Sequence, residues 1–231
     1  MLPFSINTLM CKSDVHYLSG FLQSIPLGCE VNIMFTEGGR NLNPVAEPIE
    51  NLQFKKDGIE KPIITRQKDK VGGMVNLYRY VYFDVNGINK FSFSDAKNTL
   101  IEQATRDWIF NIDADEVPNK NLIQNLHSIL EGNPDTDMYM VARINTVKGL
   151  TSEDQIKWGW SVDKKGWVNF PDYQMRIYRR KDSIEWIGVV HERLTGYKKW
   201  SALPQSEDYC LYHPKDIDRQ RKQNSFYDKI G

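Results

Sequence analysis

The feature that most constrains the fold is a short apolar run leading directly into acidic residues. Residues 108–112 (Trp-Ile-Phe-Asn-Ile) are almost wholly apolar, which is typical of a strand buried on both faces of a parallel sheet. Asp113-Ala114-Asp115-Glu116 follows at once. Clustered carboxylates repel one another and favour solvent or a cation, and open α/β sheets bind ligands beyond the carboxyl ends of their strands. The segment therefore predicts a ligand site at a strand end.

The chemistry of this acidic segment suits a hard divalent cation. Mg²⁺ and Mn²⁺ prefer oxygen ligands, and Mg²⁺ commonly combines one or two carboxylates with phosphate oxygens of a substrate. Side chains alternate in extended chain, so Asp113 and Asp115 can point the same way while Ala114 points away. In the alternative interpretation, the acids favour the positive end of a helix that begins near Pro118.

Hydrophobic periodicity over the rest of the chain predicts one α/β domain. The order strand, helix, strand at the start is that of a parallel sheet with right-handed crossovers. Ser94 or Asp95 is expected to cap the second helix, and Pro118 to open the third. Helices are expected at 18–25, 96–104, 122–130 and 216–229, and strands at 3–9, 31–35, 108–112, 138–144, 174–178 and 186–190. Between residues 40 and 90 only a strand near Ile63 and an aromatic run at 78–83 stand out.

Composition excludes several classes of protein. Of the 231 residues, 40% are hydrophobic and 26% charged, as in ordinary globular proteins. Thirty basic and thirty acidic residues cancel, so no general electrostatic attraction to nucleic acid or to an anionic membrane is expected. Apolar runs are too short to span a bilayer, and no signal peptide is recognisable. Three cysteines without metal-type spacing suggest reduced thiols, so a cytoplasmic protein is expected.

Several motifs, in order along the chain, resemble those of family 2 glycosyltransferases of the GT-A fold, especially the short soluble bacterial and phage type. The motifs are Asp95-Ala96-Lys97-Asn98, the strand ending in Asp113-Ala114-Asp115-Glu116, the strand from Asp172 to Arg180, Val189-Val190-His191-Glu192 and Tyr212-His213-Pro214. The resemblance spans roughly residues 4 to 227. It implies a Rossmann-like, mostly parallel central sheet flanked by helices, with a smaller antiparallel acceptor-side part. The single domain, 1–231, would comprise a nucleotide-sugar-binding half (1–116) and an acceptor-binding half (117–231).

The resemblance also implies roles in donor binding. Thr8 would lie at the nucleotide base, in the loop after the first strand. Lys97 would approach the donor nucleotide or its diphosphate. The family usually has an Asp-rich, Ser-containing loop after the second strand, and this chain has Thr36-Glu37-Gly38-Gly39-Arg40 instead, so Glu37 would replace the usual aspartate. Arg176 shares a strand with Arg179 and Arg180 and is expected to bind phosphate, unless this side of the strand is merely a solvated face.

A second set of implied roles concerns the cation and the chemical step. Asp113 would contact the ribose or the metal, and Asp115 would ligate the metal directly. His191 or His213 would contact the metal or the diphosphate. Glu192 would be the catalytic base and Asp172 the second candidate; for Glu192 the alternative is a surface ion pair with Arg193.

The implied activity is transfer of a hexosyl or pentosyl group from a nucleotide-sugar co-substrate, expected to be a UDP-sugar, to a hydroxyl acceptor. Mn²⁺ or Mg²⁺ would assist, and the configuration would be inverted. A phage enzyme acting on hydroxymethylated DNA bases, a metal-dependent nucleotidyltransferase or nuclease, and a non-catalytic carbohydrate-binding module remain alternatives. Trp158, Trp160 and Trp167 would stack on a sugar or base in the last case, or form a hydrophobic clasp. The oligomeric state stays open.

Overall fold

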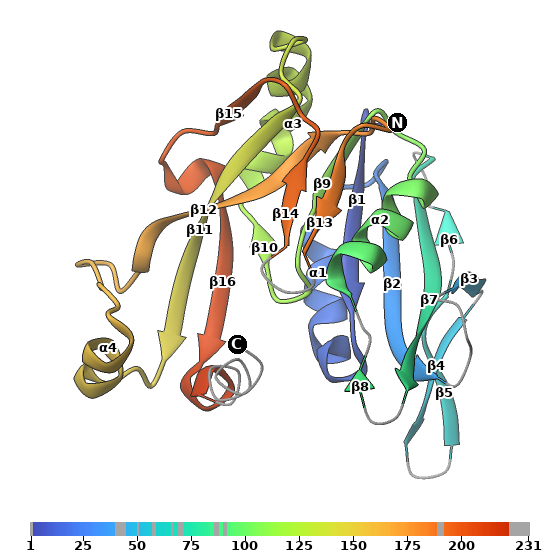
Figure 1. The fold of residues 1–231 in the computed structure, drawn as a ribbon, viewed down its shortest axis with the longest axis horizontal. Coiled ribbons are helices and arrows are strands. Elements are labelled where there is room, and N and C mark those ends of the chain that lie inside the picture. Colours follow the sequence, from blue (N-terminus) through green and yellow to red (C-terminus); the bar gives the residue numbers. More distant parts are fainter. Residues whose placement is uncertain are drawn as a thin grey trace.

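A large mixed sheet organises the chain (Figure 1). The computed structural model describes residues 2–39, 45–49, 51–56, 59–65, 67–68, 72–85, 88–89, 92–188 and 192–221. Within these ranges the sheet has twelve strands in the order β10-β16-β11-β12-β9-β1-β2-β7-β3, with β15 beside β11 and with β6 and β8 beside β7. Two small antiparallel sheets, β13-β14 and β4-β5, stand apart from it.

The elements have the following bounds. The helices are η1 (Lys12–Tyr17), α1 (Leu18–Ser24), α2 (Phe93–Gln103), α3 (Lys120–Gly132), α4 (Ser152–Trp158) and η2 (Glu207–Tyr209). The first strands are β1 (Phe4–Met10), β2 (Glu30–Gly39), β3 (Val45–Ile49), β4 (Asn51–Lys56), β5 (Ile59–Thr65), β6 (Gln67–Lys68), β7 (Met74–Val85) and β8 (Ile88–Asn89). They are followed by β9 (Trp108–Asn111), β10 (Val117–Pro118), β11 (Met138–Lys148), β12 (Val168–Arg179), β13 (Glu185–Ile187), β14 (Arg193–Thr195), β15 (Trp200–Ala202) and β16 (Cys210–Asp216).

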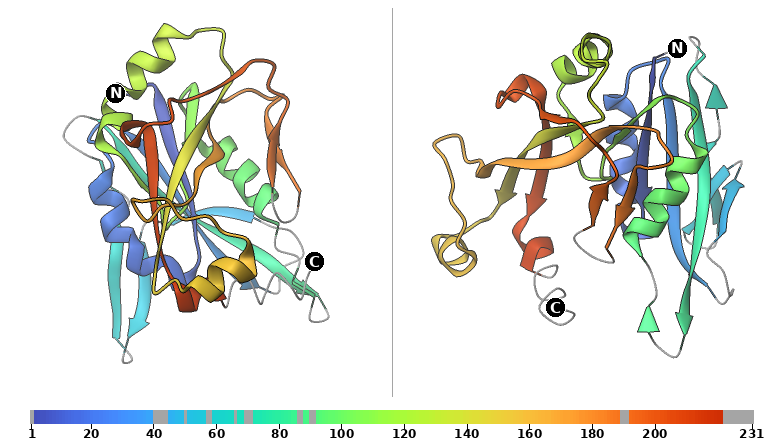
Figure 2. Two further views of the ribbon diagram at one scale, coloured as in Figure 1. Left: turned by 90° about the vertical axis from the view of Figure 1, so that its left-hand side faces the viewer. Right: turned by 45° about the horizontal axis from the view of Figure 1, so that its top comes forward.

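The centre of the sheet is a parallel core, β9-β1-β2-β7, with helices on both faces. Leu18 of α1 and Leu122 of α3 join the apolar cluster on one face, and Ala96 of α2 joins the cluster on the other. The same layers are visible in Figure 2. The expected α/β architecture, with a parallel central sheet flanked by helices, is therefore confirmed, and its antiparallel pairings lie outside the parallel core.

A row of buried asparagines crosses the parallel core. Asn7 is in register with Asn111 on one side and with Asn32 on the other, and Asn32 is in register with Asn76. Asn32 donates to the side-chain oxygen of Asn7 at 2.9 Å and accepts from Asn76 at 3.0 Å, while Asn7 donates to the carbonyl of Leu100 at 3.1 Å. Because buried amides need partners, this row favours a single alignment of the strands.

Three details of the expected elements need correction. The cap of α2 is Ser92, which has extended backbone and accepts a hydrogen bond from the Asp95 amide, rather than Ser94 or Asp95. Pro118 lies in the short strand β10, and Asn119 caps α3 instead. Strands β11 and β12 are longer than expected because their outer ends carry polar residues.

Other expected elements are confirmed only in part. Residues 217–221 are helical, and the rest of the tail expected at 216–229 lies outside the described residues. The strand expected at 186–190 corresponds to β13, with residues 189–190 outside the described ranges. None of the helices in those ranges combines the length and apolar character needed to traverse a bilayer.

A candidate active site beyond the parallel core

A cavity of about 720 Å³ opens where β9 ends. Its wall is shared by α2, the acidic bend after β9, β11, β12, β16 and the helical turn at 217–221. Most of the charged side chains singled out in the sequence meet here, although they are far apart in the chain. The cavity therefore lies where a ligand of an open α/β sheet is expected.

The acidic bend, residues 113–116, is a tight turn closed by its own hydrogen bonds. The Glu116 amide donates to the Asp113 carbonyl, and the Asp113 amide donates to the Glu116 carboxylate, both at 3.0 Å. Ala114 packs into the core, and Glu116 is fully buried. The helix-end interpretation of the acids is wrong, because the first turn of α3 holds no acidic residue.

Two arginines from neighbouring strands neutralise the buried side of this bend. Arg176 of β12, 4% exposed, bonds Glu116 at 2.7 Å and also bonds Asp113. Arg143 of β11 lies 3.3 Å from the same Glu116 carboxylate. Burial would raise the pKa of Asp113, but Arg176, and then Lys97 and Arg143, hold that pKa well below its ordinary value. In the structure Arg176 holds the acidic bend, and the expected binding of phosphate by this residue stays a prediction.

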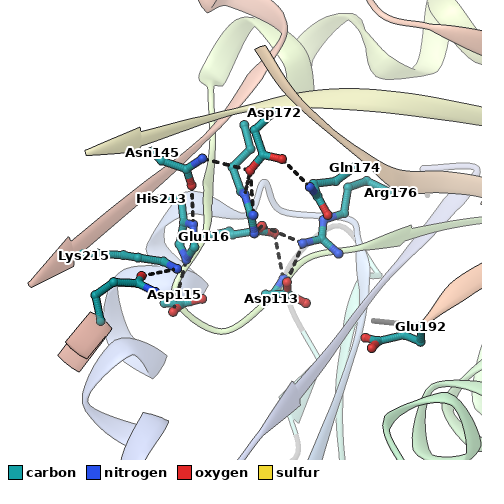
Figure 3. Close-up of polar contacts among 12 residues, drawn as sticks. Asp113, Asp115, Glu116, Asn145, Asp172, Gln174, Arg176, Glu192, His213 and Lys215 are labelled. Atoms are coloured by element: carbon teal, nitrogen blue, oxygen red, sulfur yellow. Dashed lines mark hydrogen bonds and ion pairs between the residues drawn. The ribbon is translucent and has the colours of Figure 1, made fainter. Parts of the chain in front are cut away.

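Asp115 points to the other side, toward His213 and Arg219. Its carboxylate lies 3.3 Å from the His213 Nε2 and 3.3 Å from an Arg219 Nη, as Figure 3 shows for the histidine. Burial opposes ionisation, yet the hydrogen bond and charge of His213, followed by Arg219, keep the pKa of Asp115 below its ordinary value. This carboxylate is therefore ionised at neutral pH.

A hydrogen-bonded chain orients the His213 ring. Asp172 accepts a hydrogen bond from the Asn145 amide nitrogen at 2.8 Å, which directs the Asn145 oxygen toward the His213 Nδ1 at 2.7 Å (Figure 3). Since the Nδ1 hydrogen is donated to Asn145, Nε2 either donates a second hydrogen to Asp115 or offers its lone pair to a cation placed between them. Histidines that ligate metals are held by such partners.

Asp172 is less suited to be a base than the sequence suggested. It also accepts from Arg143 at 2.8 Å and from Gln174 at 2.6 Å. Burial raises its pKa, but Arg143 and Asn145 outweigh burial and leave the pKa lowered. A carboxylate stabilised in this way accepts a proton poorly, so the geometry assigns Asp172 to orienting Asn145.

Glu192 stands across the cavity from Asp115 and is paired with Lys97. The Lys97 side chain is 6% exposed, donates to the Glu192 carboxylate and lies 4.3 Å from the centroid of the Trp186 ring. In the described chain this is the ion pair of Glu192, and the suggested pair with Arg193 is not found. Lys97 therefore contacts the candidate base, and its expected approach to the donor diphosphate stays a prediction.

The other residues expected at the site either lie away from the large cavity or lie outside the described residues. Thr8 is fully buried within β1 rather than in the loop after it, because the strand runs on to Met10. The side chain of Glu37 and all of His191 lie outside the described residues. Of the three tryptophans, Trp160 lines a separate cavity of about 210 Å³, and none lines the larger one. Their expected stacking on a ligand of that larger cavity is not supported.

Sequence reasoning missed several residues of the site. Arg143, Asn145, Lys215 and Arg219 all line one or both cavities, and none belongs to a recognisable motif. Lys215 is half-buried; burial, together with Arg143 and Arg219, lowers its pKa. A strand alternation in residues 210–216 is the one pattern that would have placed His213 and Lys215 on a common face.

Asp115 and His213 fit a divalent cation as a pair. Two adjacent ligands of an octahedral cation with bonds of ~2.1 Å lie about 3 Å apart, close to the 3.3 Å between these two atoms. Among the described residues no group of three or more His, Cys, Asp or Glu side chains is arranged for a metal. A cation here would take its other ligands from phosphate oxygens and water, as Mg²⁺ commonly does.

Comparisons with known proteins identify the family of the chain. The family model for Glycosyl transferase family 2 matches residues 76–200. Among solved structures, S. aureus TarS 1–349 is 12% identical with a TM-score of 0.49, covering 92% of this chain and 60% of its own. The same fragment in complex with UDP-GlcNAc is 12% identical with a TM-score of 0.49, covering 93% and 59%. This chain thus spans about 60% of the length of that fragment.

No curated protein matches the chain. The family match covers more than half of the 231 residues and includes α2, the acidic bend and Glu192. This chain therefore belongs to glycosyl transferase family 2 and has the GT-A fold.

Proposed function

We propose that this family 2 glycosyltransferase transfers a sugar from a UDP-sugar to a hydroxyl acceptor, with inversion and with the help of Mn²⁺ or Mg²⁺. Asp115 and His213 would hold the cation, and Glu192 would be the base. The observation that carries the proposal is the placement of this pair and of Glu192 on opposite sides of Asp113, facing one cavity (Figure 3). An inverting transfer needs that separation, because the base and the leaving group act on opposite faces of the sugar.

The residues would divide the chemical work between the two sides. On one side the cation, when bound, supplies positive charge for the departing diphosphate. On the other side Glu192 removes the proton of the acceptor hydroxyl, while Lys97 fixes the position of its carboxylate. Asp172 and Asn145 keep the Nε2 of His213 aimed at Asp115.

Geometry disfavours the alternative of a two-metal nuclease or nucleotidyltransferase. Such a site needs further carboxylates beside Asp115, and Glu116 is fully buried with Arg143 and Arg176 as partners. Asp113 is committed to Arg176 as well. A DNA-directed transferase and a carbohydrate-binding module differ in substrate, and binding experiments separate them.

Calorimetric titration with nucleotide-sugars, with and without Mn²⁺, tests the proposal. We expect metal-dependent binding of a UDP-sugar, and loss of that metal dependence in Asp115→Ala with an unchanged circular dichroism spectrum. Asp135→Ala, at a side chain 82% exposed, is the matched control. Glycan binding without nucleotide, unaffected by Asp115→Ala, would instead identify a carbohydrate-binding module.

A further inference from the structure

Nearly every charge on the wall of the large cavity has a partner of opposite charge. Four cations are neutralised by carboxylates that lie on this wall or, for Asp172, in the adjoining smaller cavity. The pairs are Lys97 with Glu192, Arg176 with Asp113, Arg143 with Asp172, and Arg219 with Asp115 and Asp14. The positive charge of each of these cations is therefore already balanced by a carboxylate of the protein.

Lys215 is different. Among the cationic side chains that line the cavity in the described residues, only Lys215 and Arg193 have no carboxylate within ion-pair distance, and Arg193 is exposed beside Glu192. Lys215 is half-buried, and its ammonium donates to the side-chain oxygen of Gln220 at 2.9 Å. The charges of Asp115 and Asp172 act on it only from beyond ion-pair distance, and burial with Arg143 and Arg219 outweighs them, so this cation is only partly compensated. An anion in the cavity would supply the missing compensation.

The strand places Lys215 on the side of the cavity where the leaving group is proposed. His213 and Lys215 are two residues apart on β16, so their side chains share one face, about 7 Å apart along the strand. Figure 3 shows Lys215 near His213 and Asp115, with Glu192 on the opposite side of Asp113. An anion held by Lys215 therefore lies away from the base.

We propose that Lys215 binds the diphosphate of the nucleotide-sugar donor and is a catalytic residue for its departure. The inference deepens the proposed function and rests on it. As the bond between the sugar carbon and the phosphate oxygen breaks, its electron pair passes to the diphosphate. The acceptor oxygen bonds to that carbon, and its proton passes to Glu192. Lys215 keeps its proton throughout and neutralises charge on the leaving oxygen.

This role gives the leaving group two separate sources of positive charge. One is the cation proposed at Asp115 and His213, and the other is the ammonium of Lys215 on the same strand face. The donor should therefore retain a weak affinity in the absence of metal, and that affinity should depend on Lys215. A site with the metal as its sole positive contact would have no such component.

The experiment is a calorimetric comparison of wild type, Lys215→Met and Lys215→Arg, each in EDTA and in Mn²⁺. The probes are UDP, GDP, CDP and dTDP; the tightest binder is then compared with its own nucleoside. In EDTA, Lys215→Met should weaken the diphosphate about 10- to 100-fold and leave the nucleoside unchanged. Lys215→Arg should recover most of the affinity. Lys199→Met, at a lysine 64% exposed and paired with Asp135, is the control.

Asp115→Asn completes the design. It should abolish the gain in affinity that Mn²⁺ gives, whereas Lys215→Met should retain that gain. Equal diphosphate affinity in wild type and Lys215→Met would overturn the role of Lys215, and so would equal losses for diphosphate and nucleoside. Failure of the wild type to bind any nucleoside diphosphate, with or without Mn²⁺, would overturn the proposed function and this inference together.

Discussion

The ammonium of Lys97 donates a hydrogen bond to the carboxylate of Glu192, a residue 95 positions later in the chain. Lys97 belongs to α2, which packs on the parallel core, and Glu192 directly precedes β14. The pair joins the two halves of the chain across the cavity. The position of the candidate base is therefore set by a helix of the half that is proposed to bind the nucleotide.

Replacing Lys97 should separate its two possible roles. Lys97→Met should lower turnover about 10- to 100-fold, because Glu192 loses the partner that positions it, with little change in nucleoside diphosphate affinity. Lys97→Arg should restore part of the turnover. Donor hydrolysis and calorimetry measure the two quantities on the same samples. Weakened diphosphate binding at unchanged turnover would show that Lys97 binds the diphosphate and does not position Glu192.

Asn145 should matter for the cation although it does not contact it. Asn145→Leu removes the acceptor for the His213 Nδ1 hydrogen and leaves the ring free to turn. We expect Mn²⁺ affinity, measured by electron paramagnetic resonance of the free ion, to fall about 10- to 100-fold. Asn125→Leu, at an exposed position of α3, is the control. Unchanged Mn²⁺ affinity would exclude His213 as a ligand.

Arg219 competes with a cation for Asp115. Its guanidinium lies 3.3 Å from the carboxylate, and its side chain is 45% exposed, so the ion pair is weak. Arg219→Gln should tighten Mn²⁺ binding about two- to fivefold in the absence of nucleotide. Arg221→Gln, which removes the ion pair with Asp154, should have no such effect. Looser Mn²⁺ binding in Arg219→Gln would show that Arg219 supports the site.

The stability of the fold should depend on the charge of Asp137 in acid. The hydrogen bond from Lys181, against the effect of burial and with help from the amides of Lys198 and Lys199, lowers the pKa of Asp137 to about 2. Since the folded pKa lies below the unfolded value, the stabilisation is complete above about pH 4 and disappears as the pH falls toward 2.

Asp137→Asn should therefore destabilise the protein at pH 7 by about 1–2 kcal/mol. Urea unfolding at pH 7, 4 and 2.5 measures the difference from wild type, which should shrink at the lowest pH. Asp135→Asn, at an exposed neighbour, controls for the change in net charge. A difference that stays constant with pH would refute this account.

The strand β9, the three main helices and the acidic bend could be predicted because each is encoded locally. An apolar run such as residues 108–112 predicts a buried strand. Apolar residues at helical spacing predict which face of α2 and of α3 is buried. Most strands between residues 40 and 90 could not be predicted, because the prolines and glycines of this region are typical of loops. The long β7 found there is held by pairing with β2, which the local sequence does not encode.

The roles within the acidic bend could not be read from the sequence. Glu116 and Asp115 are adjacent carboxylates, yet one is buried against Arg143 and Arg176 and the other faces His213. Their partners come from β11, β12 and β16, so the difference arises only when those strands assemble. For the same reason, the position of Lys97 beside Glu192 depends on long-range packing.

The asparagine row through Asn7, Asn32 and Asn76 has a consequence for the cavity above it. Shifting one of these strands by a single residue would turn its amide to the opposite side of the sheet and leave a neighbouring amide unpaired. The row thus fixes the register of these strands, and with it the position along the sheet at which each strand ends. The depth at which Asp113 and Asp115 lie in the cavity therefore depends on buried amides of the sheet beneath it.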